Sequence, residues 1–238
     1  YSSAASDVYK RQDGSWADWP EKGRLQEWYG CMECNPYQQG WFVPHDVPGM
    51  VEIMGGRDKV LADLESFFEN TPREFYWNPY YNHANEPVHH VPFLFNRLGA
   101  PWLTQYWTRV ICADAYKNSL AGLCGNEDVG QMSAWYIFSA MGFYPVTPGL
   151  PVYNIGSPLF ENIKMKLSNG NIFEIDVRNF SEKNKYIQSA SLNGIEWNKP
   201  WFHHNDIING AKLILVMGEK ANRNWGASLR NSPPSLEN

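Results

Sequence analysis

The sequence predicts a mainly α-helical fold followed by a β region. Apolar residues recur at helical spacing in several segments between residues 13 and 145, and they alternate with polar residues after Pro148. Two Asn-Gly pairs, at 169–170 and 193–194, divide the alternating part as tight hairpin turns do. Helices joined by polar loops, and then strands, suggest a helical barrel trailed by a small β region.

The first clear helix is expected in "GGRDKVLADLESFFEN", residues 55–70. Thr71-Pro72 ends it, because proline cannot continue a helix. Its apolar residues share one stripe, which consists of Val60, Leu61, Leu64, Phe67 and Phe68.

Three more helical segments follow. "NEPVHHVPFLFNRLG" has Pro87 near its first helical position and ends at Gly99, and "PWLTQYWTRVICADAYKN" opens with Pro101. "DVGQMSAWYIFSAMGFYP" runs from Asp128 to Pro145. Its apolar residues at helical spacing are Met132, Trp135, Phe138 and Met141.

Strands are expected in "IKMKLSNGNIFEIDVRN", "IQSASLNGIEW" and "AKLILVMG", so residues 150–218 should contain antiparallel strands. The opening "YSSAASDVYKRQ" fits nothing after it. We therefore divide the chain into a non-native leader (1–12), part of a helical barrel (13–148), an antiparallel β region (149–225) and a loose tail (226–238).

Composition limits the function. The net charge of −5 over 238 residues argues against nucleic acid or an anionic membrane as the main partner. No stretch reaches about 18 apolar residues, so no membrane span is predicted. Aromatic residues make up 15% of the chain. Sugar-binding clefts use aromatic rings, because the apolar face of a pyranose stacks on them, although most rings are expected in the core.

The four cysteines are best explained as buried thiols. Cys31 and Cys34 have the spacing of a redox or zinc pair, but the other two, Cys112 and Cys124, form no second pair. A structural zinc site needs about four ligands.

Asn126, Glu127 and Asp128 crowd oxygen ligands before an apolar run. Asp128 is a good N-cap, with Gln131 three residues later as in a capping box. A carboxylate at a helix N-terminus is also held ionised, as a general base must be. Both interpretations stay open on the residues alone.

A second polar block, "YGCMECNPYQQGWFVPHDVPG", spans residues 29–49. Glu33 lies among Asn35 and Trp41, and a carboxyl packed against aromatic groups has a raised pKa, which suits a general acid. The dense set of polar and aromatic residues favours function over plain surface, although His45 and Asp46 also fit a structural pair.

A third block, "YYNHANEPVHHVPFLFN", spans residues 80–96. Asn85 and Glu86 offer oxygen ligands, which suit calcium better than zinc. His89 and His90 face about 100° apart on a helix, so both cannot point at one ion.

"ECNPYQQGWFVPHDVPG", "NEPVHHVPFLFN" and "GNEDVGQMSAWYIFSAMGFYPVTPG" followed by "YNIGSPLF" resemble the signature blocks of the glycoside hydrolase family 92 α-mannosidases. The resemblance covers about residues 13–225. It implies a calcium-dependent, exo-acting, inverting enzyme with an N-terminal β-sandwich and a C-terminal (α/α)6 barrel. The chain would then be the end of that barrel with its closing strands, inactive alone, from a secreted, periplasmic or cell-surface protein that trims mannose-containing glycans.

The resemblance assigns roles residue by residue. Glu33 matches the general acid and Asp128 the general base, while Asn85 and Glu86 match the calcium-binding segment. Asn126 stands where many members carry an acid, and Cys34-Asn-Pro-Tyr departs from the commoner pattern. The expected substrate-binding residues are Asn35, Trp41, His45, Asp46, His89, Asn126, Glu127 and Gln131.

Two alternatives remain. One is a related (α/α)6-barrel enzyme that acts on another α-glycoside or on a mannosyl phosphodiester. The leaving group of a phosphodiester needs little protonation, so a general acid such as Glu33 favours the ordinary glycoside. The other is a non-catalytic sugar-binding module, which would keep the aromatic residues but does not need both Glu33 and Asp128.

Overall fold

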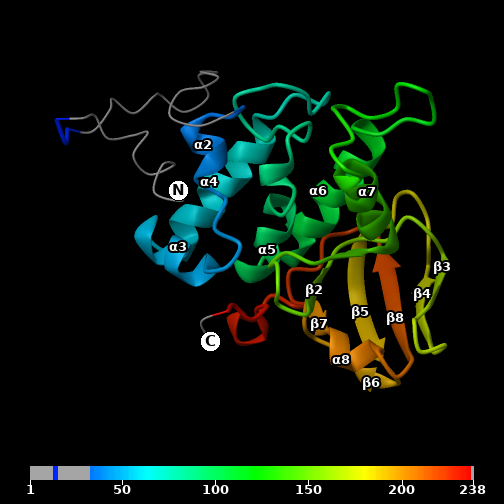
Figure 1. The fold of residues 1–238 in the computed structure, drawn as a ribbon. Coiled ribbons are helices and arrows are strands. Elements are labelled where there is room, and N and C mark those ends of the chain that lie inside the picture. The colour runs from blue at the N-terminus through cyan, green and yellow to red at the C-terminus, as the bar shows by residue number, and fades with distance from the viewer. Residues whose placement is uncertain (1–12, 16–32, 237–238) are drawn as a thin grey trace.

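The computed structural model describes residues 13–15 and 33–236, and its helices and strands occupy two halves of the molecule (Figure 1). The expected leader, residues 1–12, and Cys31 lie outside the described residues. Among the residues described, no helix is long and apolar enough to cross a membrane.

In the described residues, the helical half contains the five helices given next and the short helix α5 (Leu94–Arg97). The five are α2 (Pro36–Gln39), α3 (Val47–Ile53), α4 (Arg57–Glu69), α6 (Pro101–Asp114) and α7 (Gln131–Met141). The predictions of α4 and of a helix opening at Pro101 are confirmed. The predicted stripe of α4 is buried except for Leu61, which is half-buried.

Two helix predictions were wrong in detail. Residues 85–99 form two 3-10 turns, η1 (Glu86–Val88) and η2 (Val91–Phe93), and a short helix, α5 (Leu94–Arg97). Pro92 causes this break, because proline lacks an N–H and disfavours helical backbone before it. Helix α7 begins at Gln131 and not at Asp128, because residues 128–130 all have positive φ.

The β half contains two sheets. The first has the order β1-β2-β7, from β1 (Phe143–Tyr144), β2 (Val152–Ile155) and β7 (Trp201–His203). The second has the order β3-β4-β8-β5-β6, from β3 (Asn162–Lys166), β4 (Ile172–Arg178), β5 (Tyr186–Leu192), β6 (Ile195–Glu196) and β8 (Ala211–Gly218). A short helix, α8 (His204–Ile207), follows β7.

The prediction of antiparallel strands is confirmed for every pair but one. Strands β4 and β8 are parallel, with Ile175 opposite Leu213. Because β8 lies between β4 and β5, which run in opposite directions, it must be parallel to one of them. The two Asn-Gly turns are confirmed, since Asn193 (φ 51°), Gly194 (φ 80°) and Gly170 (φ 87°) take the left-handed conformation of tight hairpins.

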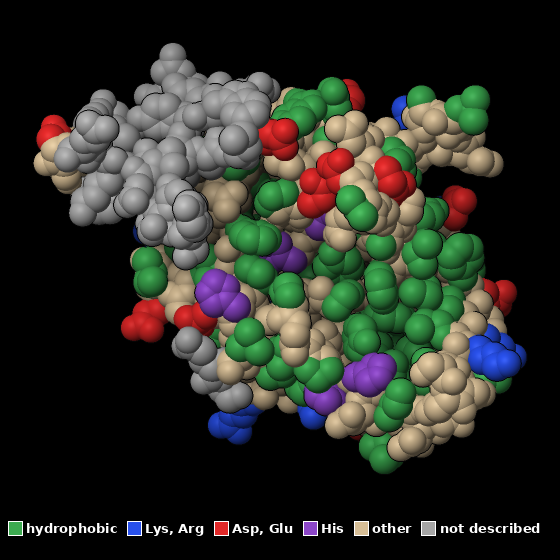
Figure 2. All heavy atoms as spheres, viewed as in Figure 1, with side chains coloured by type: hydrophobic (Ala, Val, Ile, Leu, Met, Phe, Trp, Pro, Cys, Tyr) green, Lys and Arg blue, Asp and Glu red, His purple; other side chains and the backbone are tan. Residues whose placement is uncertain are grey.

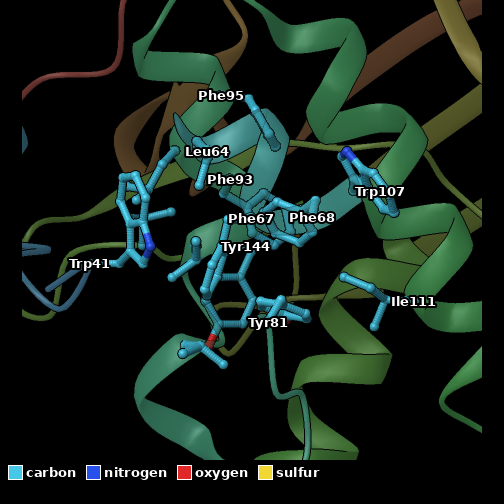
Figure 3. Packing of buried hydrophobic residues seen from close by; sticks show 14 of the residues in the cluster. Trp41, Leu64, Phe67, Phe68, Tyr81, Phe93, Phe95, Trp107, Ile111 and Tyr144 are labelled. Atoms are coloured by element: carbon cyan, nitrogen blue, oxygen red, sulfur yellow. The ribbon is translucent and has the colours of Figure 1, made fainter. Parts of the chain in front are cut away.

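Each half has its own hydrophobic core. The helical core is rich in aromatic rings, and Figure 3 shows Phe67, Phe68 and Tyr81 close together between Trp41 and Trp107. The ring centroids of Phe68 and Trp107 lie 5.1 Å apart in a stacked arrangement. This core fixes the segments that carry the polar blocks.

The described part of the tail is held against the helical half, which differs from the expected loose tail. A 3-10 turn, η3, spans Leu229–Asn231. The Ser232 Oγ donates to the Arg97 carbonyl (3.2 Å), and the Ser235 Oγ donates to the His45 carbonyl (2.8 Å).

Candidate active site

A cleft of about 690 Å³ joins the three polar blocks of the sequence. Figure 2 shows acidic side chains gathered above histidines near the centre of one face. The polar lining consists of Glu33, Asn85, Glu86, His89, His90, Gln131 and Tyr144. Phe42, Val146 and four prolines, Pro44, Pro87, Pro145 and Pro148, form an apolar wall.

Two carboxyl groups, those of Glu33 and Glu86, line this cleft, and a third, that of Asp128, interacts with Glu86 without lining the cleft. Burial is the main cause that raises the pKa of Glu86 to about 7; a hydrogen bond with Asp128 and the charges of Asp128 and Glu33 also raise it, and a hydrogen bond to its own backbone lowers it. A carboxyl group with a raised pKa retains its proton more readily and, when protonated, can donate a hydrogen bond to Asp128. Residues 33, 86 and 128 are far apart in the sequence, and the fold brings them together.

Backbone strain is concentrated at two of these positions. Glu33 has φ 55°, Asp128 has φ 46° and the β-branched Val129 has φ 59°. Left-handed backbone is uncommon for residues other than glycine and is costly for a β-branched one. The surrounding structure maintains it, since the Asn85 Nδ2 donates to the Glu33 carbonyl at 2.9 Å.

The loop that carries Asp128 closely approaches the segment of residues 80–96 because residue 125 is glycine. A Cβ at Gly125 would lie 2.8 Å from the Ala84 carbonyl oxygen and 2.9 Å from the Ala84 Cα. No side chain fits in this space, so the backbones of the two segments pack directly. This contact brings Asp128 beside Glu86.

The histidines of this region are buried and neutral. The His89 Nε2 lies 3.0 Å from the His83 carbonyl, and the His90 Nε2 lies 2.9 Å from the Trp41 carbonyl. Burial lowers the pKa of both His89 and His90 to about 4, and it lowers the pKa of His83 well below its usual range. Their two different carbonyl partners confirm that His89 and His90 do not converge on one ion.

We expect the chain to lose stability as the pH falls from about 6.5 towards 4, because protonating His83, His89 and His90 is easier in the unfolded chain. A pKa lowered in the folded state contributes stability that is present above the unfolded value and is lost on acidification. Unfolding temperatures of the 238-residue chain between pH 4 and 8 test this. His90→Gln should flatten the profile, whereas His45→Gln, at an exposed histidine, should not. An unchanged slope in His90→Gln would contradict the expectation.

Four of the predicted substrate-binding residues lie outside the cleft lining. Trp41 is 1% exposed and belongs to the helical core. Asn35 is buried as the N-cap of α2, with its Nδ2 donating to the Pro79 carbonyl. Asp46 caps α3 by accepting from the Gly49 N–H, and His45 is exposed beside it. These residues shape the loop that presents Glu33.

The remaining corrections concern the opening of α7. Asn126 is exposed and does not line the cleft. Glu127 faces a different cleft, and its carboxylate accepts from the Ser133 N–H (2.9 Å) and Oγ (2.6 Å). The prediction that Asp128 caps helix α7 was therefore wrong. Glu127, and not Asp128, accepts from the Ser133 N–H group in the first turn of the helix.

Sequence reasoning missed Phe42, Tyr144 and the prolines of the wall. Phe42 is 48% exposed, and its ring packs edge-on against His90. Nothing in the sequence distinguishes it from the adjacent Trp41, since only packing decides which ring turns inward. The sequence analysis expected Glu33 to be packed against aromatic groups, and this was wrong, because the Glu33 side chain is exposed.

The donor set near Glu86 fits a hard cation. The Glu86 Oε1 is buried and has no hydrogen-bond partner within the described residues. Carboxylate and amide oxygens from Glu86, Asp128 and Asn85 are the ligand type that calcium prefers. No group of three or more His, Cys, Asp or Glu side chains is placed to hold a metal in the part of the chain described. Further ligands would have to come from other oxygens.

Comparison with known proteins identifies the family. Residues 8–219 match the glycosyl hydrolase family 92 catalytic domain. An uncharacterized secreted glycosidase of Arthroderma benhamiae is 33% identical over 207 residues, which cover 86% of this chain and 26% of that protein.

Solved structures agree. A family GH92 alpha-mannosidase from Bacteroides thetaiotaomicron has a TM-score of 0.86 and 37% identity, covering 94% of this chain and 30% of that one. An inverting mannosidase of the same family and organism has a TM-score of 0.83 and 33% identity, covering 95% and 33%. The chain thus spans about a quarter to a third of the length of these relatives. It belongs to glycosyl hydrolase family 92.

Proposed function

We propose that this chain supplies the catalytic carboxyl groups of an exo-acting, inverting α-mannosidase that hydrolyses α-mannosidic linkages in glycans. The observation that carries the proposal is that Glu33 and Glu86 line one cleft while Asp128, which is not part of its lining, interacts with Glu86. Glu33 and Asp128 both have left-handed backbone. The solved relatives named as alpha-mannosidase and inverting mannosidase support the substrate class.

In this proposal Glu33 protonates the departing glycosidic oxygen, and Asp128 removes a proton from the attacking water. Inversion needs room for that water, so the two carboxyl groups should lie about 6.5–9.5 Å apart in the complex. Exposure of both side chains suits groups that meet a substrate from solvent. Glu33 favours an ordinary glycoside over a mannosyl phosphodiester, whose leaving group needs little protonation.

The test uses a full-length chimera, in which residues 33–236 replace the corresponding segment of the B. thetaiotaomicron α-mannosidase. Proton NMR during hydrolysis of methyl α-mannoside should show β-mannose first. Early α-mannose would refute inversion. Activity only on another α-glycoside or on a mannosyl phosphodiester would favour the alternative enzyme. Binding without turnover by an intact chimera would favour a sugar-binding module.

We further propose that Asn85 and Glu86 hold a calcium ion. When bound, calcium would supply positive charge that helps bind and distort the sugar. Its ligands in this chain would be hard oxygens, and the unpaired Glu86 Oε1 supports this assignment.

Calcium should therefore raise the unfolding temperature of the chelator-treated 238-residue chain. Ligand at 100 times its Kd stabilises by about 2.7 kcal/mol. Zinc should be a poor substitute. Glu86→Gln should remove the calcium-dependent rise, whereas Glu174→Gln, on the surface of β4, should keep it. An equal rise in Glu86→Gln would exclude Glu86 as a ligand.

We also infer a location outside the cytoplasm, secreted, periplasmic or at the cell surface. The A. benhamiae relative is named a secreted glycosidase, and glycans are mostly met there. A β-sandwich and further barrel helices of an (α/α)6 barrel would supply the rest of the site, so the chain alone should be inactive.

A further inference from the structure

A buried hydrogen-bond relay leads from the backbone carbonyl of His83 through the His89 ring to the cleft. The His83 carbonyl can only accept, so the His89 Nε2, 3.0 Å away, carries the hydrogen. Because His89 is neutral, its Nδ1 is then an acceptor. The Gln131 Nε2, at 3.1 Å, must be the group that donates to it. The tautomer of His89 thus fixes which way the Gln131 amide faces.

The orientation of the Gln131 amide in turn determines its hydrogen bond to Tyr144. Its second Nε2 hydrogen goes to the Tyr144 hydroxyl oxygen at 3.0 Å. Both amide hydrogens are then used, and the Gln131 Oε1 remains as an acceptor. Within the described residues the Tyr144 hydroxyl has Gln131 as its hydrogen-bond partner and accepts from it, so its own hydrogen is left for another acceptor. Both residues line the cleft.

The His83 ring lies outside the relay, and its own hydrogen bonds hold the segment that supplies the carbonyl. The Tyr116 hydroxyl donates to the Met132 carbonyl (3.0 Å), so it must accept from the His83 Nε2 at 2.7 Å. The His83 Nδ1 then accepts from the Tyr81 hydroxyl at 2.7 Å. His83 is 0% exposed, so these bonds do not exchange with water.

We propose that Tyr144 and Gln131 form a donor–acceptor pair that binds one hydroxyl group of the sugar in the cleft, with its direction set by His89, which is held by the His83 backbone carbonyl. A sugar hydroxyl both donates and accepts, so it can donate to the Gln131 Oε1 and accept from the Tyr144 O–H. This inference rests on the proposed function. Tyr144 is the new binding residue, and His89 is the positioning residue.

The packing of the Tyr144 ring holds its hydroxyl group in a fixed position before substrate binds. Its ring is 9% exposed and stacks on Phe93 at 5.0 Å with an interplanar angle of 15°. Tyr144→Phe keeps this stack and removes only the hydroxyl. Gln131 keeps its bond to His89 in that variant, so the fold should be retained.

The kinetic test compares methyl α-mannoside with its 2-, 3-, 4- and 6-deoxy analogues in the full-length chimera. Tyr144→Phe should lower kcat/KM about ten-fold for the parent sugar, as expected for loss of one hydrogen bond. One deoxy analogue, which lacks the partner hydroxyl, should show no loss. Tyr136→Phe, on α7 but facing the other clefts, should change nothing. If Tyr144→Phe lowered kcat/KM equally for all five sugars, or for none of them, the proposal that Tyr144 and Gln131 bind one hydroxyl group would be wrong.

A second test does not depend on hydrolysis. Nitrogen-15 NMR of the 238-residue chain should show His89 as the neutral Nε2–H tautomer between pH 6 and 8. If His89 carried its hydrogen on Nδ1, Gln131 would turn its oxygen towards it, and the proposal would fail whatever the chimera hydrolyses. A chimera that hydrolyses no mannoside while His89 shows the Nε2–H form would instead count against the proposed function.

Discussion

Asp128→Asn in the full-length chimera is expected to lower kcat by about 10²–10⁴-fold, the usual loss when a general base is removed. Asparagine has nearly the shape of aspartate but cannot take a proton from water. Steady-state kinetics on methyl α-mannoside measure the loss, and thermal unfolding of the same preparation measures stability.

The unfolding temperature should change little in this variant. Asp128 is exposed and does not cap α7, which begins at Gln131. Its backbone is left-handed, with φ 46°, and asparagine tolerates this conformation as well as aspartate does. A collapse of kcat with an unchanged fold therefore assigns the effect to chemistry.

Glu127→Gln is the matched control one residue away. The substitution replaces the charged carboxylate that accepts hydrogen bonds from the Ser133 N–H and Oγ by a neutral amide. The unfolding temperature should therefore fall while kcat stays the same. If Asp128→Asn retained the parent kcat, the base would have to be sought elsewhere.

The sequence predicted those elements whose own pattern decides their structure. The stripe of α4 and the two Asn-Gly turns are local signals, and the structure confirms them. The insertion of β8 between β4 and β5 was missed, because strand order depends on packing between distant segments. The interrupted helix at 85–99 was missed although Pro92 marked it, since the apolar spacing around it looked helical.

The site was predicted at the level of blocks but not of side chains. Residue types identified the three segments that meet at the cleft. Which member of each segment turns inward depends on the core: Trp41 fills it, so Phe42 faces the cleft. Because residues 128–130 have left-handed backbone, helix α7 begins only after them. The hydrogen bond expected from a capping Asp128 is therefore made by Glu127, which accepts from the Ser133 N–H. The raised pKa of Glu86 was not foreseen, because burial beside two carboxylates follows only from the fold.

Glu33→Gln is expected to depend on the leaving group. A general acid is needed only when the departing oxygen is a poor leaving group, so methyl α-mannoside should lose about 10²–10⁴-fold in kcat/KM. A dinitrophenyl α-mannoside, whose leaving group departs without a proton, should lose far less.

Glutamine retains the length of Glu33 and leaves the bond from the Asn85 Nδ2 to the backbone carbonyl in place. The site geometry should therefore survive, and the unfolding temperature checks this. Asp128→Asn is the contrasting variant, because the attacking water is common to both substrates and both should slow alike. An equal loss on the two mannosides in Glu33→Gln would show that Glu33 does not donate the proton, since a residue that only shapes the cleft has no reason to distinguish leaving groups.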